Sequence, residues 1–289
     1  MKPPAFQYLR PNTVSEALDM LAAAGEDAKI LAGGQSLVPM LNFRLLKPSA
    51  LIDINRIGEL DFISESETGL RIGALTRHRV TQTSPLIAKH FPVLTAAMDH
   101  VAHLAIRNRG TIGGSLSHAD PAAELPLLMT LLDAKIRLAS RNGSRELSPA
   151  EFFQGSLMTA LEEGEILTEV ELPYLPANTR WGFEEFAQRS GDFAIVAAAV
   201  TATLSGEKCD ACRIAVIGGE MPIRVPEAED ALAGIVPTAE HIKTAATIAS
   251  EAAEWNEDLH ASRDFRKQLV QTLVARALTA ALSPSRPVH

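Results

Sequence analysis

Two pairs of glycines, each followed closely by a serine, are the residues of this chain that best suit the binding of an anion. The first pair stands in ILAGGQSLVPM, residues 30–40, and the second in RNRGTIGGSLSHADPAAELP, residues 107–126. Glycine tolerates positive φ and has no Cβ, so successive backbone N–H groups can converge on an anion at close range. A serine hydroxyl adds a neutral donor. Two such loops could hold the two phosphates of a pyrophosphate from opposite sides, without a lysine or a metal ion.

Neither pair belongs to the better-known nucleotide-binding motifs. The chain contains no G-x-x-x-x-G-K-[ST] sequence, which excludes a P-loop NTPase. It also lacks the Rossmann sequence G-x-G-x-x-G with an acidic residue further on. Either pair alone is equally compatible with an ordinary tight turn, so the hypothesis depends on both loops acting together.

The residues after the second pair favour a ligand there. Asp120 and Pro121 suit the cap and first position of a helix over residues 121–132, whose N-terminus would face the loop. Glu124 is a poor phosphate ligand but a good acceptor for ribityl or ribose hydroxyls. Its alternative role is simply favourable placement in the first helical turn.

Composition excludes several classes of protein. The 289 residues carry 27 Lys and Arg against 35 Asp and Glu, a formal charge of -8, with no basic block, so nucleic acid is not an expected partner. The N-terminal MKPPAFQYLRP has no secretory core, and no segment reaches the roughly 18 to 20 apolar residues of a membrane span. We expect a cytoplasmic protein without stable membrane insertion.

Cysteine and histidine offer no expected metal site. Cys209 and Cys212 form a lone C-x-x-C, which we place on a polar turn between two strands. A [2Fe-2S] cluster takes more thiolates than this chain has, so any iron–sulfur relay belongs to another polypeptide. The histidines are scattered without ligand spacing, although His118 lies inside the second loop. We expect no acid, base or nucleophile among the side chains.

The predicted fold class is α+β. Residues 1–57 predict a small parallel β-α-β unit, in which Thr13 and Glu16 form a capping box and Gly25 ends the helix. Residues 58–176 predict an antiparallel sheet with helices, including one long helical stretch over residues 85–105. Together they form a predicted first domain, 1–176, followed by a linker at about residues 175–180.

The C-terminal domain, 177–289, is predicted to contain a three-stranded antiparallel sheet and three helices. The strands are expected over residues 181–189, 194–206 and 212–219, and the alanine-rich helices over residues 226–236, 239–255 and 264–282.

Three motifs in this order resemble one known family. LAGGQSL with PML behind it, IRNRGTIGGSLSHADPAAELP and RSGDFAIVAAAV together look like the FAD-binding medium subunit of the xanthine dehydrogenase and carbon monoxide dehydrogenase family. The resemblance runs the length of the chain. It implies a flavoprotein subunit of a molybdenum hydroxylase. A large subunit would hold molybdopterin, a small subunit would hold two [2Fe-2S] clusters, and the assembly would be a dimer of heterotrimers. FAD on this chain would pass electrons to an external acceptor.

The resemblance also implies the residues that contact the cofactor. Those from Ala32 to Ser36 and from Thr111 to Ser115 should wrap the pyrophosphate, and Glu124 should bind the sugar alcohol. Leu167 and Phe193 should lie beside the isoalloxazine, although ordinary core packing is an alternative for both. The full expected set is Leu31, Ala32, Gly33, Gly34, Gln35, Ser36, Leu37, Thr111, Ile112, Gly113, Gly114, Ser115, His118, Glu124, Leu167 and Phe193.

Two residues depart from the family pattern. Ser115 stands where the family often has asparagine, and Glu124 where it often has aspartate, which changes the hydrogen bonds expected at the pyrophosphate and ribityl chain. Gln35 follows Gly34, where a covalent flavin would need His or Cys, so we expect non-covalent FAD. A free-standing FAD oxidoreductase and a flavin-less scaffold subunit remain as alternatives. The substrate and the electron acceptor stay open.

Overall fold

The N-terminal residues form the predicted parallel sheet, with strand order β1-β3-β2. The computed structural model of the chain describes residues 2–283. Residue 1 of the first predicted domain and residues 284–289 of the second lie outside the described residues. The predicted capping box is formed in part: Thr13 Oγ1 accepts from Glu16 N at 3.1 Å, but the Glu16 carboxylate accepts from Asn12 N at 2.7 Å instead of Thr13 N. Gly25 ends the helix as predicted, at φ 76°. The elements are β1 (Gln7–Leu9), α1 (Val14–Ala24), β2 (Lys29–Leu31), α2 (Leu37–Asn42) and β3 (Ala50–Asp53).

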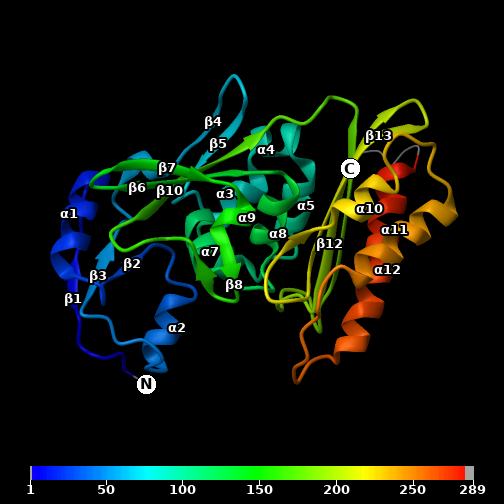
Figure 1. Ribbon diagram of the computed structural model, residues 1–289. Coiled ribbons are helices and arrows are strands. Elements are labelled where there is room, and N and C mark those ends of the chain that lie inside the picture. Colours follow the sequence, from blue (N-terminus) through cyan, green and yellow to red (C-terminus); the bar gives the residue numbers. More distant parts are fainter. Residues whose placement is uncertain (1, 284–289) are drawn as a thin grey trace.

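The next part of the chain builds the predicted antiparallel sheet, of order β4-β5-β10-β6-β7, over a layer of short helices (Figure 1). Its elements run from η1 (Gly58–Leu60), β4 (Ile63–Glu65) and β5 (Gly69–Gly73) through α3 (His78–Thr83), α4 (Pro85–His90), α5 (Pro92–Met98), α6 (Leu104–Arg107), α7 (Ile112–His118) and α8 (Glu124–Leu131) to β6 (Lys135–Ser140), β7 (Gly143–Leu147), α9 (Pro149–Phe152), β8 (Phe153–Gly155), β9 (Met158–Thr159) and β10 (Ile166–Pro173).

The single long helix predicted over residues 85–105 is wrong. Helix α4 ends before Phe91, which has φ -136° and ψ 62°, and Pro92 then starts α5. The physical reason is that a proline disfavours helical dihedrals in the residue before it. The apolar periodicity continues across the break because both helices pack against the same core.

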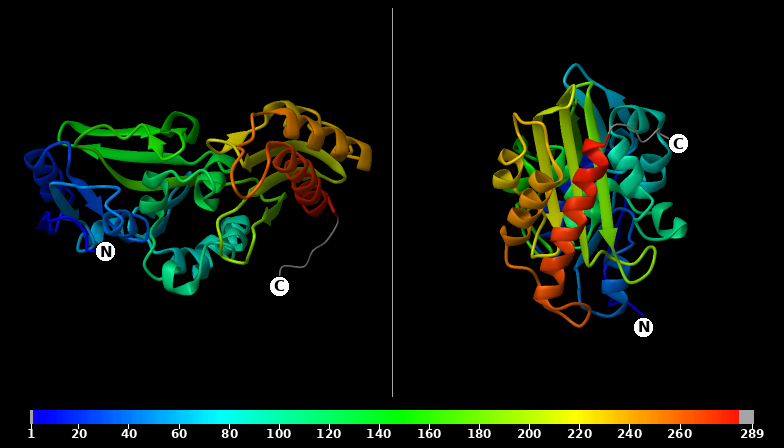
Figure 2. Two further views of the ribbon diagram at one scale, coloured as in Figure 1. Left: turned by 90° about the horizontal axis from the view of Figure 1, so that it is seen from below. Right: turned by 90° about the vertical axis from the view of Figure 1, so that its right-hand side faces the viewer.

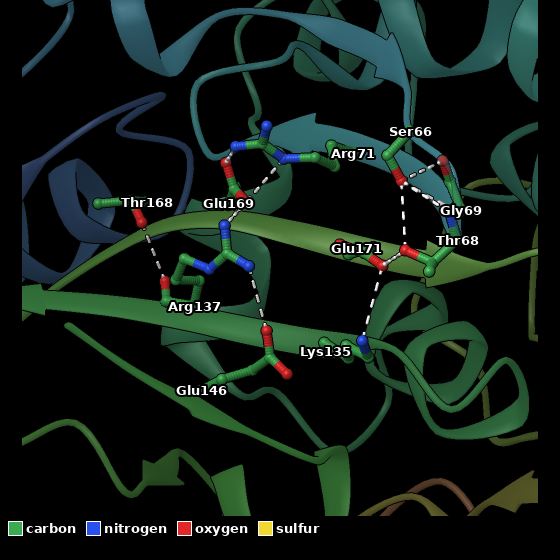
Figure 3. A network of polar contacts seen from close by, with 10 residues as sticks. All are labelled: Ser66, Thr68, Gly69, Arg71, Lys135, Arg137, Glu146, Thr168, Glu169 and Glu171. Carbon is green, nitrogen blue, oxygen red and sulfur yellow. Dashed lines mark hydrogen bonds and ion pairs between the residues drawn. The ribbon is translucent and has the colours of Figure 1, made fainter.

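The outer face of this sheet carries a ladder of paired charges (Figure 3). Glu169 on β10 accepts from Arg71 Nε on β5 at 3.0 Å and from Arg137 Nη1 on β6 at 2.5 Å. Arg137 also reaches Glu146 on β7 at 3.2 Å. The inner face of the same strands supplies apolar side chains to the core. Alternation along a strand thus separates a charged face from a buried one.

The C-terminal part contains a four-stranded sheet, of order β11-β12-β13-β14. The three predicted strands and three predicted helices are present, and the short β14 was not predicted because two residues carry no periodicity. The elements are β11 (Thr179–Phe186), β12 (Val196–Ser205), β13 (Lys208–Ile217), β14 (Ile223–Arg224), α10 (Pro226–Asp230), α11 (Ala239–Glu251) and α12 (Arg263–Leu282).

This sheet lies between two helical layers. Helices α11 and α12 cover its outer face, as the right-hand view of Figure 2 shows. Helices α5 and α8 of the preceding part contact its inner face. Along β12, Ala197 and Ala199 join the core of the preceding part, whereas Val196, Ala198 and Val200 join the core beneath α11 and α12. The small residues at the inner face allow α8 to approach the strands closely.

The predicted position of the cysteine pair is wrong. Cys209 and Cys212 lie within β13 and are buried, because the hairpin turns earlier, at Gly206 and Glu207. Gly206 has φ 64°, which suits a two-residue hairpin turn. The polar residues around the cysteines face solvent from β13. A strand with such residues resembles a turn when only its sequence is considered.

Among the helices described in residues 2–283, none has the length and apolar character needed to cross a membrane.

Candidate functional site

The first glycine pair follows the edge strand β2 and leads into α2. Gly34 has φ 73°, a left-handed conformation that favours glycine. Within residues 2–283, the backbone N–H groups of residues 33–37 donate to no other protein atom. The Gln35 side chain turns back instead, and its Nε2 donates to Gly33 O at 2.9 Å. A run of adjacent, unused N–H groups is suited to hold an anion such as phosphate.

The second glycine pair forms the first turn of α7 and uses its N–H groups differently. Gly113 N donates to Ala74 O at 2.9 Å, and Gly114 N donates to the Thr111 hydroxyl, which caps the helix, at 3.1 Å. Ser115 N donates to Thr111 O at 3.0 Å. The convergence of free N–H groups expected from the sequence is therefore present in the first loop and largely absent from the second. The Ser115 hydroxyl has no protein partner in the described part of the chain.

The two glycine loops lie directly against each other. A Cβ on Gly33 would overlap the carbonyl oxygen of Arg109 and lie 2.9 Å from Gly110 Cα. The corresponding position on Gly114 lies 3.9 Å from Ala32 Cβ. Gly33 is thus required for close approach of the two backbones, and Gly34 for its dihedral angle. Segments far apart in the sequence form one continuous surface.

The remaining predicted residues divide by burial. The side chains of Ile112 and Leu167 are part of the main core, with exposed fractions of 0% and 4%. Phe193 is 62% exposed and is not held by core packing. It lines a pocket of about 420 Å³ together with Pro121, Ala122 and residues of the C-terminal part. Leu31, Leu37 and His118 are half-buried around the loops.

The predicted cap at Asp120 is wrong. The Asp120 carboxylate accepts from Ala122 N at 2.9 Å, which makes a local turn, and α8 begins only at Glu124 with Ala123 at its cap position. The competing hydrogen bond explains the difference, since a short acidic side chain can close its own turn instead of capping a helix. Glu124 is therefore the first residue of α8.

Glu124 belongs to a cluster of titratable side chains where the two parts of the chain meet, with the buried carboxylate of Glu185 and the exposed His100. Burial, with a smaller effect of Glu185, raises the pKa of the Glu124 carboxyl to about 8. Glu185 on β11 lies 3.5 Å from His100 Nδ1, and hydrogen bonding to this carboxylate raises the pKa of His100. Glu185 Oε2 is buried without a protein partner in the described residues. Hydroxyl groups of a ligand could supply the missing donors.

Three residues beside the loops were missed by sequence reasoning. Asn55 donates to Ala32 O at 2.8 Å and accepts from Arg77 Nη2 at 2.7 Å. The buried His78 ring fills the space next to Gly110, and its Nε2 donates to Thr111 O at 3.0 Å. Burial lowers the pKa of His78 to about 4, so the ring is neutral near pH 7. One clue was available for Asn55: it follows β3, whose carboxyl end must lie beside that of β2 in a parallel sheet.

No group of three or more His, Cys, Asp or Glu side chains in residues 2–283 is placed to hold a metal ion. The polar atoms at the glycine loops are instead backbone donors and neutral hydroxyls, and the buried Glu124 carboxyl belongs to the first residue of the next helix, α8. This donor set suits a ligand with both a diphosphate and a polyhydroxyl chain.

Comparison with known proteins identifies two matching domain families. Residues 4–175 match the FAD binding domain in molybdopterin dehydrogenase, and residues 181–281 match the CO dehydrogenase flavoprotein C-terminal domain. The chain is 44% identical over 289 residues to the 6-hydroxypseudooxynicotine dehydrogenase complex subunit alpha of Paenarthrobacter nicotinovorans, covering 99% of this chain and 98% of that protein. It is 37% identical to the carbon monoxide dehydrogenase medium chain of Hydrogenophaga pseudoflava, covering 97% and 98%.

Solved structures agree with this assignment. A chain of quinoline 2-oxidoreductase from Pseudomonas putida 86 matches with a TM-score of 0.93 and 44% identity, over 97% of this chain and 98% of that one. A chain of carbon monoxide dehydrogenase from Hydrogenophaga pseudoflava matches with a TM-score of 0.95 and 39% identity, over the same shares of 97% and 98%. The resemblance noted in the sequence is confirmed, and the chain belongs to the FAD-binding medium subunits of the molybdenum hydroxylase family, as a subunit of an oxidoreductase.

Proposed function

We propose that this chain holds FAD non-covalently and carries electrons from [2Fe-2S] clusters on one partner subunit to an external acceptor. A large partner would hold molybdopterin and oxidise the substrate, and the assembly would be a dimer of heterotrimers. The names of the relatives support separate subunits, since they are a subunit alpha and a medium chain. The presence of only two cysteines also supports iron–sulfur clusters on another chain.

The observation that carries this proposal is the run of unused N–H groups at residues 33–37, packed against a second glycine loop. We assign the diphosphate of FAD to this surface, with the Ser115 hydroxyl as a further donor. Backbone N–H groups bind a phosphate without a counter-ion, because several oriented dipoles act on the same oxygen atoms.

The other assigned residues orient the cofactor and limit access to it. We assign Glu124 to the ribityl hydroxyls and Phe193, with Leu167, to the wall beside the isoalloxazine. An apolar wall excludes water and restricts which acceptors reach the ring. When bound, FAD supplies the redox chemistry, because it collects an electron pair and releases it. We assign the flavin chiefly to the first domain, residues 1–176, with Phe193 contributed by the second domain, residues 177–289.

The direct test is the flavin content of the purified chain and of glycine variants. Wild type is expected to retain one FAD per chain. Gly33→Ala should lose it because the new methyl group would overlap the Arg109 carbonyl, and Gly34→Val because a β-branched residue strains φ 73°. Gly206→Ala is the matched control, since it has positive φ in a distant hairpin turn with open space around it. Full flavin retention in the Gly33 and Gly34 variants would show that the loop is misassigned.

Two further measurements separate the remaining alternatives. Acid precipitation should leave a colourless pellet, because a yellow pellet would mean a covalent flavin. Co-purification should yield a large complex. An active monomer would instead favour a free-standing FAD oxidoreductase, and a complex without flavin would favour a scaffold subunit.

A further inference from the structure

We propose that Asn55 and Arg77 are positioning residues that hold the two glycine loops in the geometry needed to grip a diphosphate. This inference rests on the proposed FAD function and deepens it, since neither residue is a predicted FAD contact. Asn55 comes from the segment after β3, and Arg77 precedes α3, so both lie outside the loops they support.

Asn55 fixes the first loop through carbonyl groups. Its Nδ2 donates to Ala32 O at 2.8 Å and, more weakly, to Leu31 O at 3.4 Å. The carbonyl of Ala32 and the N–H of Gly33 belong to one planar peptide unit and point in opposite directions. Anchoring that carbonyl therefore turns the Gly33 N–H away from Asn55. The side-chain amide of Asn55 thus sets the direction of the Gly33 N–H, the first of the unused N–H groups of residues 33–37.

Asp53 in turn fixes Asn55. Its Oδ1 accepts from Asn55 N at 3.0 Å and from Asn55 Nδ2 at 2.6 Å, which orients the amide. Tyr8 donates its hydroxyl to the other carboxylate oxygen of Asp53, and Arg10 lies 3.7 Å from it. Because Asp53 is 6% exposed, its carboxylate is held in place by the strands around it. The orientation of the Asn55 amide is thereby tied to the parallel sheet.

Arg77 connects this assembly to the second loop. One end of its guanidinium, Nη2, donates to Asn55 Oδ1 at 2.7 Å, and the other, Nη1, donates to the Arg109 carbonyl. Arg109 is the residue whose backbone meets Gly33. A planar guanidinium with donors in a fixed fork keeps two acceptors at a constant separation. Arg77 thus links Asn55, which holds the first loop, to the backbone of the second loop.

The geometry implies that the two side chains act as one unit. Removing Arg77 disconnects Asn55 from the second loop, and removing Asn55 leaves Arg77 attached to only one loop. Either loss should loosen the same spacing between loops. The effects of the two substitutions should therefore overlap rather than add, as expected for residues in one hydrogen-bond network.

The test is a double-mutant cycle on the dissociation constant for FAD, measured by titrating the flavin-free protein with FAD. Asn55→Ala and Arg77→Gln should each weaken binding roughly 10- to 100-fold, the range for a lost hydrogen bond to a charged group. The dissociation constant of the double variant should lie within about threefold of that of the single variant that binds FAD more weakly. Arg77→Lys should bind FAD more tightly than Arg77→Gln but less tightly than wild type, since lysine keeps the charge but lacks the paired donors of the guanidinium. Arg79→Gln is the control and should bind as wild type, because this exposed guanidinium donates to Gln82 and to no residue of the glycine loops within residues 2–283.

Two outcomes would overturn the inference: single variants within about twofold of wild type, or losses that multiply in the double variant. Far-UV circular dichroism of each flavin-free variant identifies unfolding. If Arg77→Gln fails to fold, Asn55→Ala and Arg77→Lys still decide the question, because both must weaken FAD binding. A wild-type chain that binds no FAD would refute the proposed function itself, which separates that failure from failure of the positioning role.

Discussion

At the scale of single residues, Glu124 is the buried acidic residue of the predicted site set. It is 5% exposed, and its carboxyl has a pKa raised to about 8 by burial and by the nearby Glu185. Because the folded state holds the proton more tightly than the unfolded chain, the stability due to this group is full below pH 4.5 and is lost as the pH rises through about 8.

Glu124→Gln should therefore stabilise the flavin-free chain by an amount that grows as the pH rises from about 4.5 to about 8. At pH 8.5 we expect the variant to be more stable than wild type by roughly 2–4 kcal/mol, because the amide needs no proton to remain neutral when buried. At about pH 4.5 the two proteins should be equally stable. Urea denaturation at both pH values measures this. Glu26→Gln, at an exposed loop position, is the control for replacing one carboxylate by an amide.

The glycines of the site show how the same residue type serves different needs. Gly34 adopts a left-handed φ, Gly33 allows two backbones to touch, and Gly113 packs against Ala74. Only the general suitability of glycine was visible in the sequence. A Gly-Gly pair does not reveal which of its members touches another segment, because that depends on a partner distant in the chain.

At the scale of elements, the charge ladder on the five-stranded sheet joins β5, β10 and β6. Glu169 is 6% exposed and lies between Arg71 and Arg137. Glu169→Ala should lower the free energy of unfolding by roughly 1–3 kcal/mol, since it leaves two guanidinium groups without their shared carboxylate.

Glu146→Ala provides the matched comparison for the ladder. Glu146 pairs with Arg137 at 3.2 Å, but its side chain is 40% exposed, so its loss should cost less than about 1 kcal/mol. Urea denaturation of both variants beside wild type measures the difference. Equal losses for the two glutamates would contradict the importance of burial in this network.

Elements specified by neighbouring residues could be predicted from the sequence. The Thr13 cap of α1, the strand before the first glycine pair and the parallel β-α-β unit all depend on short-range patterns. The break at Phe91, the late start of α8 and the early turn before Cys209 were missed. In each case a single local contact or dihedral angle outweighed a correct apolar pattern.

The candidate site divides in the same way. Both glycine loops and Glu124 could be found because glycine spacing and an acidic residue at a helix start are visible in one dimension. Arg77 and Glu185 could not, because their importance comes from contacts with residues far away in the chain. For Asn55, only its place at the carboxyl end of a parallel strand was visible. Nothing near Arg77 in the sequence marks Arg109 as its partner.

At the scale of the whole molecule, the two parts of the chain share a core. The apolar cluster that contains Ile72 of β5 also contains Ala199 of β12 and Ile217 of β13. Helix α8 contacts both β12 and β13. The C-terminal sheet thus buries one face against the N-terminal part, so removal of that part would expose apolar side chains of the sheet.

A shared core of this kind should make unfolding cooperative across the molecule. Trp255 belongs to the core beneath α11 and α12 and reports on the C-terminal part, whereas Trp181 packs against the shared core and is replaced by phenylalanine in every protein measured. Ile72→Ala in the N-terminal sheet removes a fully buried side chain, which costs roughly 2–5 kcal/mol. If the parts unfold together, this distant substitution should lower the urea midpoint seen by tryptophan fluorescence, in step with far-UV circular dichroism. Val270→Ala in α12 should lower the fluorescence midpoint whether the two parts unfold together or separately. An unchanged fluorescence midpoint for Ile72→Ala, beside an earlier loss of circular dichroism, would mean that the C-terminal part stays folded without its neighbour.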